Sequence, residues 1–332
     1  MKANRIISGL CIAALAMVAG ACQQSYHQQD ERYVLVTANV QLPYWQEAAA
    51  GMTDIGKTAG VKVDVVGPAS FSPSEELTAF QQAVAQHPSG ILVCVTDPKL
   101  FKEPIDKAVM QGTPVITIDA DAPDSNRILF IGTDNFRAGQ ESGKRMADLL
   151  GGTGRVVVIT LGGQLNSERR MQGVNEALKN YPGIKIIQTI DDKGDARVAY
   201  DGVSALLLKH EKFQGIICLE ASGGGGAADA LHRLDLTEKI KIMAFDKDPQ
   251  TLEGIERKWI TATVVQKPYV MAFYGVRFLD DLHHNVVHEF KDWATAPAAP
   301  LPTFVDTGTA VIDITNLAAF RRALSEHPKP VI

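Results

Sequence analysis

The chain has 332 residues, which is long enough for two domains of ordinary size. Hydrophobic residues make up 45% and charged residues 21%, a normal globular composition that argues against intrinsic disorder. The formal net charge of −5 argues against a nucleic-acid-binding protein, which would need a basic surface, and four cysteines are too few for a disulfide scaffold.

Residues 1–21 have the pattern of a secretory signal peptide. Two basic residues precede an apolar stretch at residues 6–19, and small residues follow as a cleavage site. Cys22 comes next, as in the bacterial lipobox, where the cysteine is lipidated and becomes the first mature residue. Ala19 replaces the usual lipobox leucine, so the alternative is a secreted protein with a free Cys22. We expect lipidation of Cys22 and a polar tether over residues 22–30.

In the first half of the body, short β-branched runs alternate with longer segments of helical periodicity. The runs are nearly continuous in hydrophobicity, which is typical of parallel strands covered on both faces. Strands are expected at 33–37, 61–66, 91–95, 115–118 and 128–131, and helices at 47–59, 75–86 and 101–111.

The second half repeats this scheme. Strands are expected at 156–159, 184–188, 215–219, 240–244 and 260–264, and helices at 168–180, 195–209, 224–233 and 249–257. A long helix at 269–290 and a Pro/Ala-rich stretch at 294–302 precede a strand-like pair near 303–312 and a helix at 317–325.

The alternation of strands and helices indicates right-handed βαβ crossovers and open, doubly wound sheets. The rhythm breaks near residues 132–136, where Asp134 and Asn135 are expected to cap the following helix or to brace the hinge, and breaks again after Gln266. A closed barrel would instead need eight equal units. The sequence therefore predicts an α/β protein with two similar lobes.

Candidate site residues follow the expected strands, because ligands of open α/β sheets bind beyond the carboxyl ends of the strands. Aromatic faces can cover the apolar side of a sugar ring, and carboxylates and amides hydrogen-bond its hydroxyls. Residues of these types favour a polyhydroxylated ligand. The candidates are Tyr44, Trp45, Asp119, Asn166, Glu168, Arg170, Glu220, Asp246 and Gln266.

Other chemistries find less support. Two Gly-rich stretches (GGTG and SGGGG) lack the Gly-Lys-Ser/Thr of a P-loop, and neither directly follows the first strand as dinucleotide binding requires. His284 and His288 are four residues apart on the expected long helix, with His283 and Glu289 beside them. The spacing permits a metal, but His-Glu-x-x-His is absent and a solvated helix tail is expected. Since a Gly-x-Ser-x-Gly elbow is also absent, we expect no enzyme, cofactor or metal site.

Six phrases occur in an order that resembles the type 1 periplasmic sugar-binding proteins, the ribose- and galactose-binding family that serves ABC importers. The resemblance covers about residues 31–325, and no single phrase carries it alone. The phrases are PYW (43–45), PVITID (114–119), IGTDN (131–135), NSERRMQGV (166–174), AFDKDP (244–249) and ATVVQKPY (262–269).

The resemblance implies two Rossmann-like lobes joined by a hinge of three strands, with the ligand between them. It places residues 31–133 plus 267–300 in the N-terminal lobe and residues 134–266 plus 301–332 in the C-terminal lobe. The roles it implies are a stacking pair at Tyr44 and Trp45, hydroxyl-binding carboxylates at Asp119 and Asp246, and an amide beside the hinge at Gln266.

The sequence departs from the ribose-binding type of this family at several positions. Leu42 stands where the ribose-binding type has Asn, and Ala120 stands where it has Arg. The arginine of the NSERR segment falls on Arg169 or Arg170, and a strict register puts Glu168 there. The ribose pattern is therefore not reproduced, and the sugar stays open.

The implied function is that of the substrate-binding component of a bacterial ABC importer in the periplasm. The expected partners are a monosaccharide or similar polyol, an inner-membrane permease and, through the lipid anchor, a membrane, with the protein itself a monomer. One alternative is a periplasmic sugar receptor that feeds a sensor kinase or chemoreceptor, and another is an enzyme on the same scaffold. A sugar-responsive repressor is disfavoured because the chain has a signal peptide and lacks a basic helix-turn-helix segment.

Overall fold

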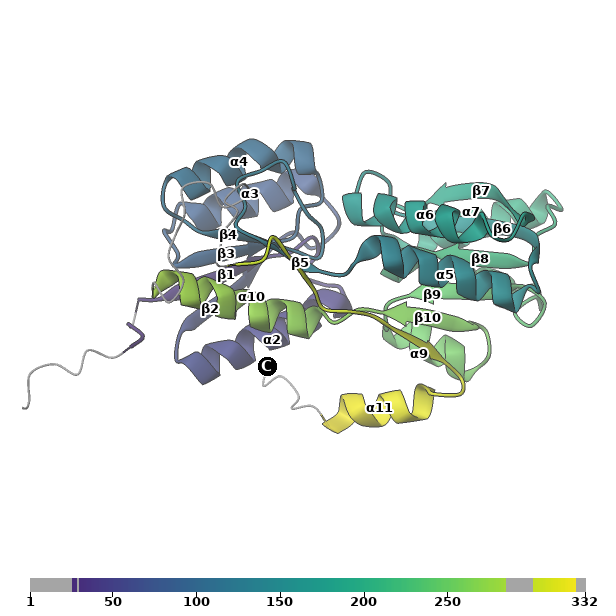
Figure 1. The fold of residues 1–332 in the computed structure, drawn as a ribbon. Helices are drawn as coiled ribbons and strands as arrows, with labels where there is room; N and C mark the ends of the chain where they lie inside the picture. Colours follow the sequence, from purple (N-terminus) through teal and green to yellow (C-terminus); the bar gives the residue numbers. More distant parts are fainter. Residues whose placement is uncertain (1–25, 29, 285–300, 327–332) are drawn as a thin grey trace, which may run out of the picture.

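The computed structural model describes residues 26–28, 30–284 and 301–326. These residues form two α/β lobes that lie side by side, each built on one six-stranded sheet (Figure 1). The signal peptide, the lipidation site and most of the Pro/Ala-rich stretch lie outside the described residues. Among the described helices, none combines the length and the apolar character needed to cross a membrane.

The first sheet has the strand order β11-β5-β4-β3-β1-β2, and all its pairings are parallel. Its strands are β1 (Arg32–Val36), β2 (Lys62–Val66), β3 (Gly90–Val93), β4 (Val115–Ile118), β5 (Phe130–Gly132) and β11 (Phe304–Asp306).

Helices cover both faces of the first sheet, which explains the continuous hydrophobic runs of its inner strands. On one face, Tyr33 and Leu35 of β1 pack in a core with α2 and α10; on the other, Val34 and Val36 pack with α3 and α4. The helices are α2 (Pro43–Ala59), α3 (Pro73–Val84), α4 (Pro98–Met110) and α10 (Pro268–His283).

The second sheet has the corresponding order β12-β10-β9-β8-β6-β7, with only β12 antiparallel to its neighbour. Helices α5 and α6 pack on one face, and α7, α8 and α9 on the other. The strands are β6 (Thr153–Thr160), β7 (Gly183–Asp191), β8 (Gly215–Cys218), β9 (Lys241–Phe245), β10 (Ala262–Val265) and β12 (Ala310–Asp313). The helices are α5 (Asn135–Leu149), α6 (Leu165–Leu178), α7 (Ala196–Leu208), α8 (Ala221–His232), α9 (Pro249–Glu256) and α11 (Leu317–Glu326).

These elements confirm the expected fold class and most of the expected strands. Several helices begin earlier than the periodicity predicted, because a proline at the first helical position needs no hydrogen bond for its nitrogen. Those helices start at Pro43, Pro73, Pro98 and Pro268. The expected cap of α5 is also found, since the Asp134 side chain accepts the backbone N–H of Arg137 at 3.0 Å.

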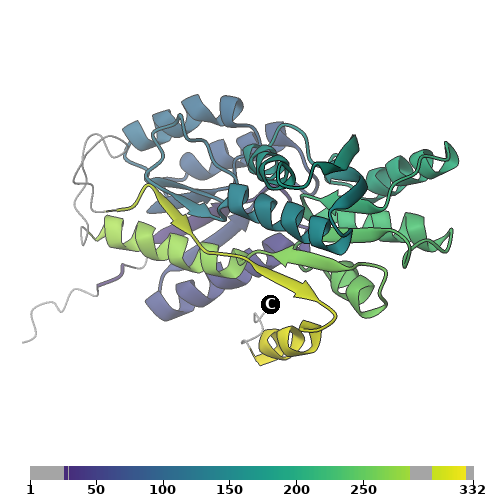
Figure 2. The same cartoon turned by 45° about the vertical axis from the view of Figure 1, so that its right-hand side comes forward.

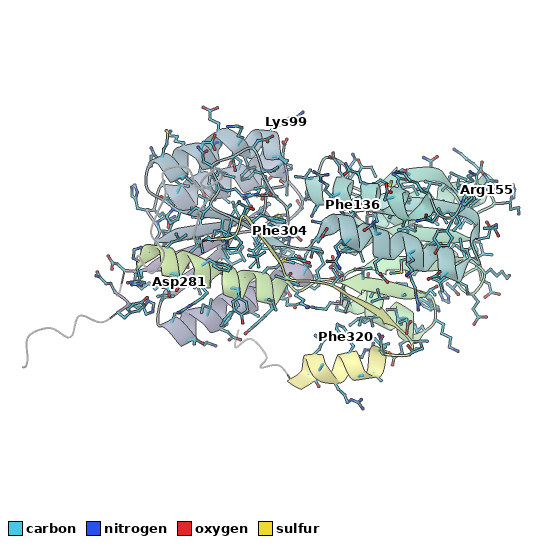
Figure 3. All side chains as sticks on the ribbon, viewed as in Figure 1. Lys99, Phe136, Arg155, Asp281, Phe304 and Phe320 are labelled. Carbon is cyan, nitrogen blue, oxygen red and sulfur yellow. The ribbon has the colours of Figure 1, made fainter. Side chains whose placement is uncertain are left out.

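The chain crosses between the lobes three times, after β5, after β10 and between β11 and β12 (Figures 1 and 2). The third crossing differs from the expected boundary at residue 300. Strand β11 belongs to the first sheet and carries Phe304, which is labelled in Figure 3. The Phe304 ring stacks on that of Phe130 with centroids 5.3 Å apart, and only the chain from β12 onward joins the second sheet. Residues 285–300, expected in the N-terminal lobe, lie outside the described part of the chain.

Candidate functional site

A cavity lies between the lobes, at the carboxyl ends of the strands of both sheets. Its lining comes from loops and helix starts on the two sides, as expected for an open α/β sheet. The predicted residues that the structure brings together here are Tyr44, Trp45, Asp119, Asn166, Arg170, Glu220, Asp246 and Gln266.

Asp119 and Asp246 occupy equivalent places in the two lobes. Each directly follows its strand, β4 or β9, and each has a left-handed backbone, with φ of 65° and 64°. Asp tolerates this conformation better than most residues do. Both side chains are buried and both line the cavity. Each lobe therefore presents one carboxyl group from the same structural position.

Burial raises the pKa of both carboxyl groups, and the nearby Arg170 guanidinium opposes this increase. For Asp246 the resulting pKa is about 7. The raised pKa means that these groups ionise at a higher pH than ordinary aspartates. Once ionised, each carboxylate gains from every hydrogen bond that it accepts from a hydroxyl group.

Tyr44 and Trp45 belong to the first turn of α2, which ends the loop after β1. Both are buried, and their rings meet edge to face at 5.1 Å. The Tyr44 hydroxyl donates to Asp119 Oδ1 at 2.7 Å, so Tyr44 holds the first-lobe carboxyl group in place.

Arg170 is the central donor of the second lobe and is only 2% exposed. Its guanidinium donates to Asn135 Oδ1 at 2.8 Å, to the Leu219 carbonyl at 2.7 Å and to Gln266 Oε1 at 3.0 Å. It also lies 4.0 Å from the ring centroid of Phe245. An arginine side chain has five N–H donors. Three are engaged here, which leaves others for a ligand in the cavity.

Gln266 joins the hinge to this network. Its Oε1 accepts from Thr133 Oγ1 at 2.7 Å as well as from Arg170, and its Nε2 donates to Asp246 Oδ1 at 3.0 Å. Thr133 and Gln266 lie on two different crossings between the lobes. The orientation of Asp246 is therefore coupled to the hinge.

Glu220 caps α8 at the edge of the cavity. Its carboxylate accepts the backbone N–H groups of Ser222, at 2.7 Å, and of Gly223. The fully buried Asp192 lies close by, and burial together with the Glu220 charge raises the pKa of Asp192 to about 10. Asp192 is thus protonated at neutral pH.

Two contacts join the lobes across the cavity and its rim. Asn166 Nδ2 donates to Asp119 Oδ2 at 3.4 Å, and Lys247 Nζ forms an ion pair with Glu47 at 2.7 Å. Each pair takes one member from each lobe.

Glu168 is exposed and does not line the cavity, which corrects its prediction as a site residue. The segment that contains it is the first turn of α6, and residues four apart on a helix share a face. Asn166 and Arg170 therefore face the cavity together, while Glu168 and Arg169 face solvent.

Sequence reasoning missed several lining residues, among them Phe71 in the loop after β2. Phe71 has the same signal as Tyr44 and Trp45, because it is an aromatic residue beyond the end of a strand. The other missed residues include Asn39, Leu42, Leu161, Gln164 and Ser222.

Comparison with known proteins agrees with this geometry. A family model described as a periplasmic binding protein domain matches residues 33–284. The D-allose-binding periplasmic protein of Escherichia coli is 25% identical over 259 residues, which cover 75% of this chain and 83% of that protein.

Solved structures are similar over most of the chain. A sugar-binding protein of a sugar ABC transporter from Bacillus halodurans has 34% identity and a TM-score of 0.79, covering 87% of this chain and 100% of that one. The arabinose-binding protein AraP of Geobacillus stearothermophilus has 33% identity and a TM-score of 0.75, covering 88% and 99%. A protein solved as the XylFII–LytSN complex has 29% identity and a TM-score of 0.78, covering 87% and 99%.

Proposed function

The chain belongs to the periplasmic binding protein family, and on that premise we propose that it binds a monosaccharide or similar polyol between its lobes for a bacterial ABC importer. The family and the sugar-binding proteins that the chain resembles support a periplasmic sugar-binding role. They are binding proteins, which favours capture of the sugar over its chemical conversion.

The observation that carries the proposal is the meeting of two strand-end carboxyl groups with one arginine in a cavity between lobes. Asp119 and Asp246 accept hydrogen bonds and Arg170 donates them, and a sugar hydroxyl can do both. An anionic ligand would face the two acids, and a cationic ligand would face Arg170. A neutral polyhydroxylated ligand fits both kinds of group. Trp45 and Phe71 add apolar surface for its C–H groups.

Ligand capture would couple to closure of the lobes. Asp119 lies on the first lobe, and Arg170 and Asp246 lie on the second. A sugar bound to both lobes stabilises the closed arrangement relative to the open one. The closed protein then presents a joint surface to the permease, while a lipid on Cys22 would keep it at the membrane.

A periplasmic sugar receptor is the second candidate. The similarity to a protein solved as the XylFII–LytSN complex favours it, because that relative is found with a protein partner. Here the closed state would be passed to a sensor kinase or chemoreceptor. The same cavity would serve both functions.

The test begins with thermal shifts of the purified protein against pentoses, hexoses, deoxysugars and polyols, because a ligand that binds only the folded form raises its Tm. We expect one compound or a few related compounds to raise it. Calorimetry on Asp246→Asn should show weakened binding, with Glu168→Gln as the exposed control. A panel without any stabilising compound, or equal affinity in both variants, would contradict the proposal.

Sugar uptake in a deletion strain separates the two candidate functions, importer component and sugar receptor, since uptake fails only if the protein serves an importer.

A further inference from the structure

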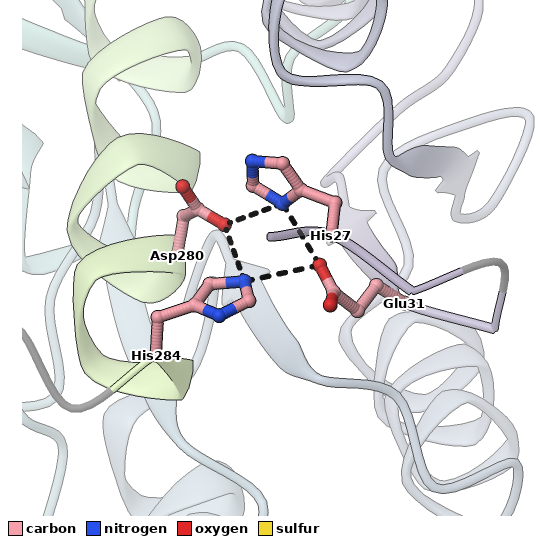
Figure 4. A group of neighbouring side chains, drawn as sticks. All are labelled: His27, Glu31, Asp280 and His284. Atoms are coloured by element: carbon pink, nitrogen blue, oxygen red, sulfur yellow. Dashed lines mark hydrogen bonds and ion pairs between the residues drawn. The ribbon is translucent and has the colours of Figure 1, made fainter. Parts of the chain in front are cut away.

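Four side chains with metal-binding atoms meet on the first lobe, away from the cavity (Figure 4). His27 and Glu31 lie in the segment just before β1, and Asp280 and His284 lie at the end of α10. This cluster is at the amino end of β1, whereas the cavity is reached through residues beyond its carboxyl end. The cluster and the cavity therefore use opposite ends of the same strand.

One nitrogen of each imidazole faces both carboxylates. His27 Nδ1 is 2.9 Å from Glu31 Oε2 and 3.5 Å from Asp280 Oδ1. His284 Nε2 is 3.2 Å from the same Glu31 oxygen and 3.5 Å from the same Asp280 oxygen. The shorter contact of each histidine is a hydrogen bond with Glu31 Oε2. Together the two nitrogens and two oxygens surround a common centre.

Four of the six separations among these atoms are close to those of a zinc site. Bonds of about 2.0–2.2 Å from zinc to nitrogen or oxygen give ligand-to-ligand distances of about 3.3–3.6 Å in a tetrahedron. The four nitrogen-to-oxygen distances run from 2.9 to 3.5 Å and the other two separations do not exceed 4.8 Å, so small side-chain shifts would complete a tetrahedron around an ion. We propose that His27, Glu31, Asp280 and His284 bind one Zn²⁺ ion.

Neighbouring groups hold the two acids in position. The backbone N–H of Gln28 donates to Glu31 Oε1 at 2.6 Å, which leaves Oε2 toward the cluster. The Tyr33 hydroxyl donates to Asp280 at 3.2 Å. Such outer hydrogen bonds orient ligands at known metal sites.

Burial gives a reason for a cation at this place. Glu31 is 3% exposed and Asp280 is 1% exposed. Two buried carboxylates so close together need positive charge. Arg277 supplies part of it, at 3.5 Å from Asp280 Oδ2, and a divalent ion would supply it where Asp280 Oδ1 and Glu31 Oε2 meet. Imidazole and carboxylate ligands suit zinc, and four protein ligands make the site structural rather than catalytic.

The site corrects the expectation of a solvated tail for the histidines of α10. His284 has a side chain only 13% exposed, while its neighbour His283 is exposed. His288 and Glu289 lie outside the described residues. The partners of His284 come from the other end of the sequence, which is why the spacing of the histidines within the helix could not reveal them.

A zinc ion here would fasten the start of the folded chain to α10. Residues 27–31 lead out of the expected tether, so the ion would fix the point where the tether leaves the first lobe. The proposal is independent of sugar binding, since none of its four ligands lines the cavity.

The experiment uses the purified protein without a polyhistidine tag, stripped with a chelator and titrated with Zn²⁺ by calorimetry. We expect binding of one ion per chain and a higher Tm. The variants His27→Gln and His284→Gln should each bind Zn²⁺ at least tenfold more weakly. His283→Gln is the matched control on the same helix and should bind as the parent does. Substituted Co²⁺ should give the strong visible absorption of a tetrahedral complex.

Two outcomes would overturn the proposal: no binding of Zn²⁺ to the parent protein, or undiminished binding in both ligand variants. The variants His27→Gln and His284→Gln change different elements, so a folding defect in one leaves the other to decide. Unchanged sugar affinity with and without Zn²⁺ would show that the result does not depend on the function of the cavity.

Discussion

The two halves of the cavity offer the same acid from the same structural position but support it differently. In the first lobe, Asp119 is held by a phenol, because the Tyr44 hydroxyl donates to it at 2.7 Å. In the second lobe, Asp246 is held by Gln266, which is bonded in turn to Arg170 and to Thr133. The bond from Tyr44 is local to the first lobe, and the second lobe adds only the longer contact from Asn166 to Asp119, at 3.4 Å. The support of Asp246 runs through two of the three crossings between the lobes.

This difference indicates a division of roles. The first lobe presents a carboxyl group whose bond to Tyr44 lies within that lobe and does not involve the hinge. The second lobe presents a network that includes hinge residues, so it can respond to the angle between the lobes. Variants on the two sides should therefore differ in their effect on closure as well as in affinity.

Arg170→Met should have the largest effect. The substitution leaves the Leu219 carbonyl and the Asn135 side chain without their donor, and each buried unpaired group costs about 1–3 kcal/mol. We expect loss of detectable sugar binding and a fall in the free energy of unfolding of at least about 2 kcal/mol, measured by urea denaturation. Arg169→Met, at the exposed neighbouring position, is the control. Equal stability of the two variants would remove Arg170 from the centre of the network.

Asp246→Asn and Asp119→Asn compare the two acids directly. Each loses charged hydrogen bonds to ligand hydroxyls, worth about 1.5–3 kcal/mol, so affinity should fall about tenfold to a hundredfold in calorimetry. Small-angle scattering with saturating sugar should show closure retained in Asp119→Asn and reduced in Asp246→Asn. The same degree of closure in both variants would mean that the division of roles is absent.

The pH dependence of sugar binding should reveal the raised pKa of Asp246. Because the pKa of Asp246 is about 7 in the folded protein, a proton must leave before this group can accept hydrogen bonds as an anion. Sugar affinity should therefore rise between pH 5.5 and 8, by as much as about tenfold per unit below the pKa. In the absence of sugar, the same group should make the protein less stable as the pH rises from about 4 to 7, since the unfolded chain loses this proton earlier. A profile that Asp246→Asn leaves unchanged would assign the effect to another group.

Tyr44→Phe should have the smallest effect, because it removes one hydroxyl and keeps the ring. Loss of a single hydrogen bond of about 1 kcal/mol predicts about fivefold weaker sugar binding. Tyr274→Phe, at an exposed position, serves as the reference in the same titration. A loss as large as that of Asp119→Asn would show that the hydroxyl itself contacts the sugar.

The sequence was sufficient for the fold because the hydrophobic runs of parallel strands are distinct and the strand ends locate a ligand site. Asp119 and Asp246 could be found because each follows a clear strand. The sequence alone could not show that Arg170 faces the cavity and Glu168 faces solvent, because the residue at which α6 begins was not known. On a helix, two residues that are two positions apart point to opposite faces. The last crossing was misplaced because composition marked the Pro/Ala-rich stretch, whereas the strand β11 beyond it still belongs to the first sheet.

The proposed zinc site shows a stronger limit on what can be predicted from sequence alone. His27 and His284 are separated by nearly the whole folded chain, and only the pairing of β1 with its neighbours and the packing of α10 bring them together. A local pattern such as two histidines one helical turn apart says nothing about a partner so distant in sequence. Such a site can be found only from the three-dimensional structure, which shows the contact between the two segments.

The position of α10 has a consequence for how the chain is made. This helix begins at Pro268 and covers one face of a sheet whose first five strands end at Gly132. While the ribosome is still adding the middle of the protein, this face of the sheet is covered by α2 alone, and the sheet lacks its edge strand β11. The first lobe therefore cannot finish folding until synthesis is nearly complete, and a nascent chain that stays open so long is suited to threading through an export channel.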